Sequence, residues 1–169
     1  MAKRLEIDIS IADQGWSAAL WDVENICQSA AGTAFEMTAH GETENAEVSI
    51  LLTDDSQMRS LNRDYRNRDQ ATNVLSFAGT DEGKPFATGP VLLGDIVVAL
   101  GVCSREAKNE KKSLADHLAH LVIHGMLHLL GYDHEIEEDA EKMESLEIEA
   151  LAKLGVADPY TESNQGASR

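Results

Sequence analysis

Five of the six histidines in this 169-residue chain fall between residues 117 and 134. His124 and His128 are four residues apart, so on a helix they project from the same face, one turn apart. Gly131 permits a sharp exit from that helix, after which the chain can bring His134 back toward the pair. Three neutral imidazoles leave the fourth tetrahedral position of a zinc ion open, as in catalytic zinc sites. The spacing therefore predicts one metal ion per chain, expected to be zinc, held by His124, His128 and His134.

Three neighbouring residues are candidates for supporting roles. His117 and His120 lie on nearly the same helical stripe, and their location favours a structural or substrate-lining role over metal ligation. Asp133 could orient an imidazole by accepting its free N–H, or it could cap the following helix. Both interpretations of Asp133 stay open.

The histidine spacing matches that of zinc proteases with the pattern H-E-x-x-H-x-x-G-x-x-H. In those enzymes the glutamate that follows the first histidine is the general base. Gly125 occupies this position here and cannot accept a proton. The pattern thus predicts a metal-dependent hydrolase that lacks the base of these proteases.

A cluster of arginines stands out in an otherwise acidic chain. The net charge is −16, which argues against indiscriminate binding to nucleic acid or to anionic membranes. Residues 56–68 nevertheless hold Arg59, Arg63, Arg66 and Arg68 against Asp64 alone. A guanidinium is a planar, permanent cation suited to phosphate oxygens, so a polyanion would bind locally here. The alternative is that these arginines form the solvated face of a short helix.

Periodicity predicts strands first and helices later. Leu5, Ile7 and Ile9 alternate with polar residues, whereas apolar residues recur at three and four from Trp16 to Ala30. Asp54 or Asp55 is expected to cap a short helix with Met58, Leu61 and Tyr65 on its inner face. Further strands are expected at Val48–Leu52, Asn73–Ala78 and Val91–Ala99, the last two as an antiparallel hairpin, and further helices at Leu114–Leu130 and Glu137–Leu154.

The expected architecture is a mixed α/β (α+β) fold: a small four-stranded mixed sheet packed with helices, in one domain over residues 1–158. Residues 159–169 are expected to form a flexible polar tail. The sequence contains no run of about 18 apolar residues, so we expect no membrane span. The N-terminus lacks the apolar stretch of a signal peptide, so we expect a cytoplasmic protein. Cys27 and Cys103 are expected to be buried, unpaired residues.

The run HGMLHLLGYDH, residues 124–134, resembles the signature of the YbeY endoribonuclease family. Two further blocks agree in order and spacing, LNRDYRNRDQATNVLSF at 61–77 and LLGDIVV at 92–98. Ala71 stands where proline is expected, and Ala99 where a small polar residue is common. The resemblance implies a zincin-like fold with a histidine-bearing metal helix, and three histidine zinc ligands at His124, His128 and His134.

The same resemblance implies a cytoplasmic metallo-endoribonuclease specific for single-stranded RNA. It would act in 16S ribosomal RNA 3′-end maturation and late ribosome quality control. The essential arginine of the family maps to Arg66, with Arg59 and Arg63 as candidates for guiding the RNA backbone. Asn73 and Ser76 are candidates for the lining of the groove, or are ordinary strand residues.

Two other classes of protein fit parts of the pattern. One is a zincin-like metallopeptidase whose base lies outside the helix, which would cut protein and leave RNA intact. The other is a non-catalytic zinc-binding module associated with the ribosome, which would need a fourth protein ligand such as Asp133.

Overall fold

The structure is a computed structural model that describes residues 4–38, 45–79, 91–132 and 136–160. Its helices and strands, in chain order, are β1 (Arg4–Ile11), α1 (Gly15–Ala19), α2 (Val23–Met37), β2 (Asn45–Thr53), α3 (Asp55–Arg66), β3 (Val74–Ala78), β4 (Val91–Ala99), α4 (Leu100–Asn109), α5 (Leu114–Leu129) and α6 (Glu137–Lys153).

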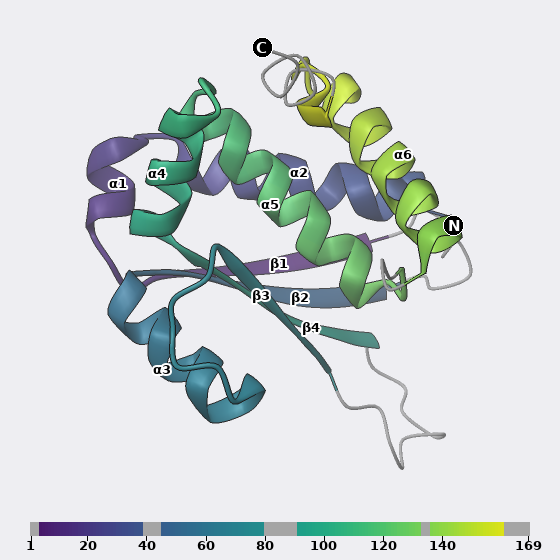
Figure 1. The fold of residues 1–169 in the computed structure, drawn as a ribbon. Helices are drawn as coiled ribbons and strands as arrows, with labels where there is room; N and C mark the ends of the chain where they lie inside the picture. The colour runs from purple at the N-terminus through teal and green to yellow at the C-terminus, as the bar shows by residue number, and fades with distance from the viewer. Residues whose placement is uncertain (1–3, 39–44, 80–90, 133–135, 161–169) are drawn as a thin grey trace.

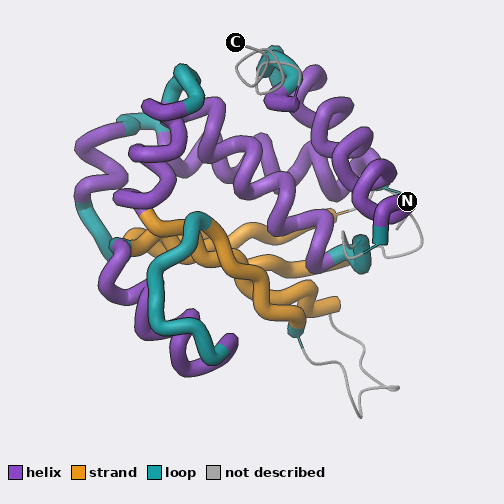
Figure 2. Tube along the Cα trace, in the orientation of Figure 1, coloured by secondary structure: helices purple, strands orange, loops and turns teal. Residues whose placement is uncertain are grey.

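The four strands form one mixed sheet in the order β1-β2-β4-β3. β1, β2 and β4 are parallel, and β3 pairs antiparallel with β4 at the edge of the sheet. The tube in Figure 2 shows the sheet as one layer between helices. The expected α+β class, the four-stranded mixed sheet and the antiparallel hairpin are confirmed.

The helices cover the two faces of the sheet unequally (Figure 1). α2 and α5 pack over one face, and their buried side chains join those of β2, β4 and α6 in the main hydrophobic core. α3 lies alone on the opposite face, where Met58 packs against Val97 and Ala99 in a smaller core. The histidine-bearing helix α5 is therefore held between the sheet and α6.

Local sequence signals fix both ends of α5. The Ser113 hydroxyl accepts a hydrogen bond from the backbone N–H of Asp116 at 3.0 Å and so caps the start of the helix. At the other end Gly131 has a φ of +102°, and its N–H donates to His128 while that of Tyr132 donates to Leu127. This is a Schellman motif, in which glycine permits the left-handed turn.

The predicted helix from Trp16 to Ala30 is two helices. Leu20 ends α1 in an extended conformation, and α2 starts at Val23. The cause is a long-range contact, because the buried indole of Trp16 donates to the carbonyl of Thr53 at 3.1 Å. This hydrogen bond fixes α1 at the end of β2 and separates it from α2.

Two further expectations need correction. Tyr65 was expected on the inner face of its helix, but it is 65% exposed. It lies in the last turn of α3, where its ring contacts Phe77 of the edge strand β3. Pro159 is buried and Tyr160 is hydrogen-bonded, so ordered structure continues two residues past the expected end at 158. Residues 161–169 of the expected tail lie outside the described residues.

Cys27 and Cys103 are buried and free, as expected. Across the described residues, no helix combines the length and the apolar character needed to span a membrane.

Candidate active site

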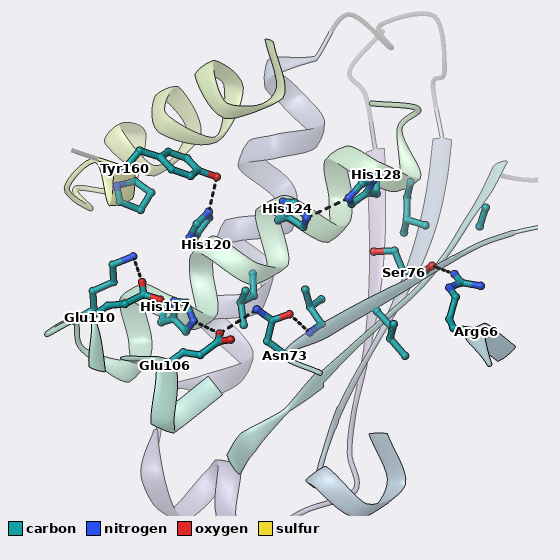
Figure 3. Close-up of a pocket in the computed structure, with 17 residues that line it drawn as sticks. Arg66, Asn73, Ser76, Glu106, Glu110, His117, His120, His124, His128 and Tyr160 are labelled. Atoms are coloured by element: carbon teal, nitrogen blue, oxygen red, sulfur yellow. Dashed lines mark hydrogen bonds and ion pairs between the residues drawn. The ribbon is translucent and has the colours of Figure 1, made fainter. Parts of the chain in front are cut away.

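A cavity of about 810 Å³ opens between α5, β3 and the C-terminal segment that follows α6. His117, His120, His124 and His128 follow one another along it on α5 (Figure 3). Glu106 and Glu110 lie at one end, and Arg66 lies at the other.

The His124 and His128 rings converge inside this cavity. Their Nε2 atoms are 3.1 Å apart, and the two rings are inclined at 83° to each other. Two nitrogen ligands of a tetrahedral zinc ion, each at about 2.0–2.1 Å, stand about 3.3 Å apart. The two described histidines therefore fit a shared metal ion.

Glu147, on the buried face of α6, fixes the orientation of His124. The Glu147 side chain is 1% exposed, and its Oε2 accepts a hydrogen bond from Nδ1 of His124 at 2.6 Å. With the proton on Nδ1, the Nε2 of His124 carries a lone pair and suits a metal ion. Glu147 thus selects the tautomer that a ligand needs.

The same carboxylate holds two more groups. Nε2 of His120 donates to Oε1 of Glu147 at 2.7 Å, and the hydroxyl of Tyr160 donates to the same oxygen. Burial alone would raise the pKa of Glu147, but the hydrogen bonds from His120 and His124 outweigh burial and lower this pKa to about 2. Burial and the bond to Glu147 raise the pKa of the Tyr160 phenol. Glu147 therefore stays ionised as the common acceptor of three donors.

A second acid organises the far end of the cavity. Oε1 of Glu106 accepts from Nε2 of His117 at 2.8 Å and from the side-chain amide of Asn73 at 3.0 Å. His117 is 3% exposed, and the Nδ1 atoms of His117 and His120 are buried without a hydrogen-bond partner among the described residues. Both rings therefore use Nε2 toward a glutamate.

Arg66 reaches the cavity from the last turn of α3. Its guanidinium donates to the carbonyl of Ser76 at 2.8 Å and to that of Tyr65 at 3.4 Å, and it lies 4.7 Å from the centroid of the Phe77 ring. Within the described part of the chain, no carboxylate forms an ion pair with it. Its positive charge therefore remains available to an anion in the cavity.

Arg59 and Arg63 are placed differently. Arg59 forms two hydrogen bonds to Asp69, at 2.8 and 3.0 Å, and Arg63 contacts Asp64 at 3.2 Å. The hydrogen bond from Arg59 lowers the pKa of Asp69. Both arginines are exposed, lie outside the cavity lining and have part of their charge offset by these acids.

The free edge of β3 also lines the cavity. The carbonyl of Asn73 and the N–H of Gly79 form hydrogen bonds with β4. The carbonyl of Ser76 points the other way, to the free edge, where it accepts from Arg66. Because this direction alternates along an antiparallel strand, Val74 and Ala78 face the free edge as well. The Ser76 hydroxyl donates in the other direction, to the carbonyl of Gly125 at 3.3 Å.

Gly125 faces the sheet and not the cavity. A Cβ atom built there would lie 3.0 Å from Cγ2 of Ile96 and 3.1 Å from Oγ of Ser76. The residue after His124 thus marks the close approach of α5 to the strands, and a longer side chain would not fit without displacing them.

His134 and Asp133 lie outside the described residues. Within the residues that are described, no three His, Cys, Asp or Glu side chains form a metal-binding group. The third ligand and the role of Asp133 therefore stay predictions.

Glu147, Glu106 and Tyr160 were not predicted from the sequence. One signal existed for Glu147, because it follows Met143 by four residues and precedes Ala150 and Leu151 on the apolar stripe of α6. An acid at such a position needs buried partners. For Tyr160 the sequence carried no comparable signal, because it stands in a short polar segment.

Comparison with known proteins identifies the family of this chain. The family model of endoribonuclease YbeY matches residues 11–155. The endoribonuclease YbeY proteins of Paramagnetospirillum magneticum and Azorhizobium caulinodans are each 46% identical to this chain. The aligned regions cover 96% of this chain in both cases, and 99% and 100% of the two relatives, respectively. The solution structure of TM1509 from Thermotoga maritima is similar with a TM-score of 0.53 and 25% identity, over 88% of this chain and 91% of that one. This chain therefore belongs to the endoribonuclease YbeY family.

Proposed function

We propose that this chain is a zinc-dependent endoribonuclease that cleaves single-stranded RNA, and that it acts on 16S ribosomal RNA 3′ ends in ribosome maturation and quality control. Its relatives are endoribonuclease YbeY proteins, which supports the endoribonuclease activity. The observation that carries the proposal is the convergence of two imidazole nitrogens in a cavity that also contains the guanidinium of Arg66.

His124, His128 and His134 would hold the zinc ion, which when bound supplies a Lewis acid next to the phosphodiester. The remaining chemistry belongs to the chain itself. Arg66 donates to non-bridging phosphate oxygens, on which negative charge develops as the phosphodiester is cleaved. Glu147 keeps the His124 ring in its ligand tautomer, so that the ring does not reorganise when the substrate binds.

The metallopeptidase alternative is less well supported. Gly125 stands at the position of the usual protease base and packs against Ile96 and Ser76, so a peptidase would need a general base from outside α5. A free strand edge beside the cavity could receive an extended peptide, but Arg66 already occupies the carbonyl of Ser76 on that edge. The non-catalytic alternative is disfavoured by the open cavity, because structural zinc sites are closed by four protein ligands.

The decisive experiment is RNA cleavage by the purified protein before and after chelation, with zinc then added back. We expect a single-stranded RNA to be cut, the activity to disappear with the chelator and zinc to restore it. Casein in parallel reactions should stay intact. Chelator-sensitive cleavage of casein, with RNA left whole, would instead establish the peptidase.

Metal content tests the ligand set separately from activity. His124→Ala, His128→Ala and His134→Ala should each bind far less zinc, because a tetrahedral site needs all three imidazoles. His117→Ala and His120→Ala are the matched controls on the same helix, and they should retain the metal. Full zinc occupancy in His134→Ala would exclude this residue as the third ligand.

A further inference from the structure

Tyr65 is an aromatic side chain that the fold leaves in solvent. It follows Met58 and Leu61 on the apolar stripe of α3, yet it is 65% exposed while Met58 is fully buried. At this exposure the Tyr65 ring cannot have both of its faces covered by protein. Single exposed apolar side chains are common on protein surfaces, so the surroundings of Tyr65 decide whether a ligand would cover it.

The Tyr65 ring is nevertheless held in place. Phe77 meets it at a centroid distance of 5.5 Å and an angle of 67°, an edge-to-face contact. Phe77 itself packs against the small core around Met58, and the Arg66 guanidinium lies over its ring. Tyr65 is therefore pre-positioned, so a ligand that covers it pays little additional side-chain entropy.

The aromatic pair adjoins the cavity through its neighbours, although neither Tyr65 nor Phe77 is part of the lining. Arg66 directly follows Tyr65, whereas Ser76 and Ala78 flank Phe77, and all three of these neighbours line the cavity. The Arg66 guanidinium lies 4.7 Å from the centroid of the Phe77 ring, which in turn contacts Tyr65, so a phosphate bound by Arg66 would lie close to this pair. Arg66 supplies a cation beside this pair, because the described contacts leave it without a carboxylate partner.

We propose that Tyr65 is a stacking platform for one nucleobase of single-stranded RNA, adjacent to the phosphate at Arg66. This inference rests on the proposed function. Stacking on an aromatic ring needs an unpaired base that can leave its neighbours, and every base has a π face. Tyr65 thus contributes selectivity for single strands over duplexes, with little preference among bases.

Binding of a fluorescently labelled, unstructured RNA oligonucleotide, followed by anisotropy under chelation to prevent cleavage, tests the proposal. Tyr65→Ala should weaken binding roughly 5-fold to 100-fold. Tyr65→Phe and Tyr65→Trp keep a ring and should bind like the unmodified chain. Trp21→Ala is the matched control and should keep normal affinity. Trp21 is 90% exposed, but it belongs to the segment between α1 and α2, which contributes no residue to the cavity lining.

Abasic substitution locates the stacked base. In a series of oligonucleotides, each lacking one base, the penalty of Tyr65→Ala should disappear at one position and persist at the others. Tyr65→Ala should leave the affinity for a blunt duplex RNA unchanged. An equal penalty at every abasic position would overturn the proposal, as would normal single-strand affinity in Tyr65→Ala.

The failure of this inference and the failure of the proposed function give different results. If the metal-loaded unmodified chain cuts RNA and Tyr65→Ala has the same affinity and KM, only the platform is wrong. If the metal-loaded unmodified chain cuts no single-stranded RNA, the proposed function is wrong. Loss of affinity in Tyr65→Phe as large as in Tyr65→Ala would assign the effect to the hydroxyl and also reject stacking.

Discussion

Glu147 is a carboxylate at a position where the pattern of α6 calls for an apolar side chain. An isolated buried charge would strongly destabilise the fold, but three donors surround this one. His120 and His124 bring two of these donors from α5, and Tyr160 brings the third from the segment after α6. One side chain of α6 thus joins His124, the proposed metal ligand, to His120 and to the C-terminal segment.

The first prediction concerns this carboxylate. Glu147→Gln should lower the zinc affinity of the chain about 10-fold to 100-fold, because an amide accepts more weakly from His124 and no longer imposes one tautomer. Competition against a chromophoric chelator measures the affinity without reference to activity. The control is Glu149→Gln, an exposed position on the same helix that should keep normal affinity. Unchanged zinc binding in Glu147→Gln would show that the hydrogen bond does not organise the ligand.

The second prediction separates two arginines of α3. Arg66→Ala should depress turnover at saturating RNA by roughly 10²-fold or more, because its expected partner is charge that appears in the transition state. Arg59→Ala should mainly weaken RNA binding, and by little, since Asp69 already pairs with Arg59. Single-turnover kinetics and zinc content should be measured together, and zinc should be normal in both variants. A change confined to affinity in Arg66→Ala would make Arg66 a docking residue.

At the scale of elements, the end of α5 decides where the chain goes after His128. Gly131 has a φ of +102°, a backbone conformation that an L side chain adopts only under strain. A Cβ there would meet nothing within 4 Å, so strain in the backbone is the whole cost of a substitution.

The third prediction compares the same substitution, glycine to alanine, at two positions where it should change the stability of the fold in opposite directions. Gly131→Ala should destabilise the chain by roughly 1–2 kcal/mol, because it forces alanine into the left-handed region. Gly32→Ala, in the middle of α2 and equally free of contacts, should stabilise by up to about 1 kcal/mol. Urea denaturation of the chelated proteins compares them without a contribution from metal. Equal effects at both positions would mean that the Schellman motif does not set this helix end.

The elements that could be predicted from the sequence are those with local signals. Asp54, Ser113 and Gly131 each mark a helix end by a contact within a few residues, and these ends are where the pattern put them. The break between α1 and α2 could not be read in this way, because it depends on Trp16 reaching Thr53 across the fold. Glu147 was missed for the same reason, since its partners lie in α5 and the C-terminal segment.

At the scale of the whole molecule, the main core encloses both cysteines. Burial raises the pKa of the Cys27 and Cys103 thiols to about 12 each, from an ordinary value near 9. The pKa of each thiol is higher in the folded chain than in the unfolded chain. Burial of the neutral thiols therefore contributes fully to stability below about pH 9. This contribution is lost as the pH rises toward 12.

The fourth prediction follows from these two thiols. The folded chain should not react with a thiol reagent such as DTNB at pH 8, whereas the denatured chain should release two equivalents. The urea concentration at the midpoint of unfolding should fall as the pH rises above 9. The fall should be smaller in a Cys27→Ala/Cys103→Ala variant. Rapid labelling of the native chain would show that the core opens far more often than its packing indicates.

The open edge of β3 has a consequence for how copies of this protein behave toward one another. A strand edge with unsatisfied backbone groups can pair with the same edge of another molecule, which is a common start of aggregation. The edge of β3 lines the cavity, and among the described strands none pairs with it on that side. The net charge of −16 then acts as colloidal protection, because it makes two approaching copies repel each other. An acidic ribonuclease is unexpected for a polyanionic substrate, but the acidity lets a bare strand edge remain in solution.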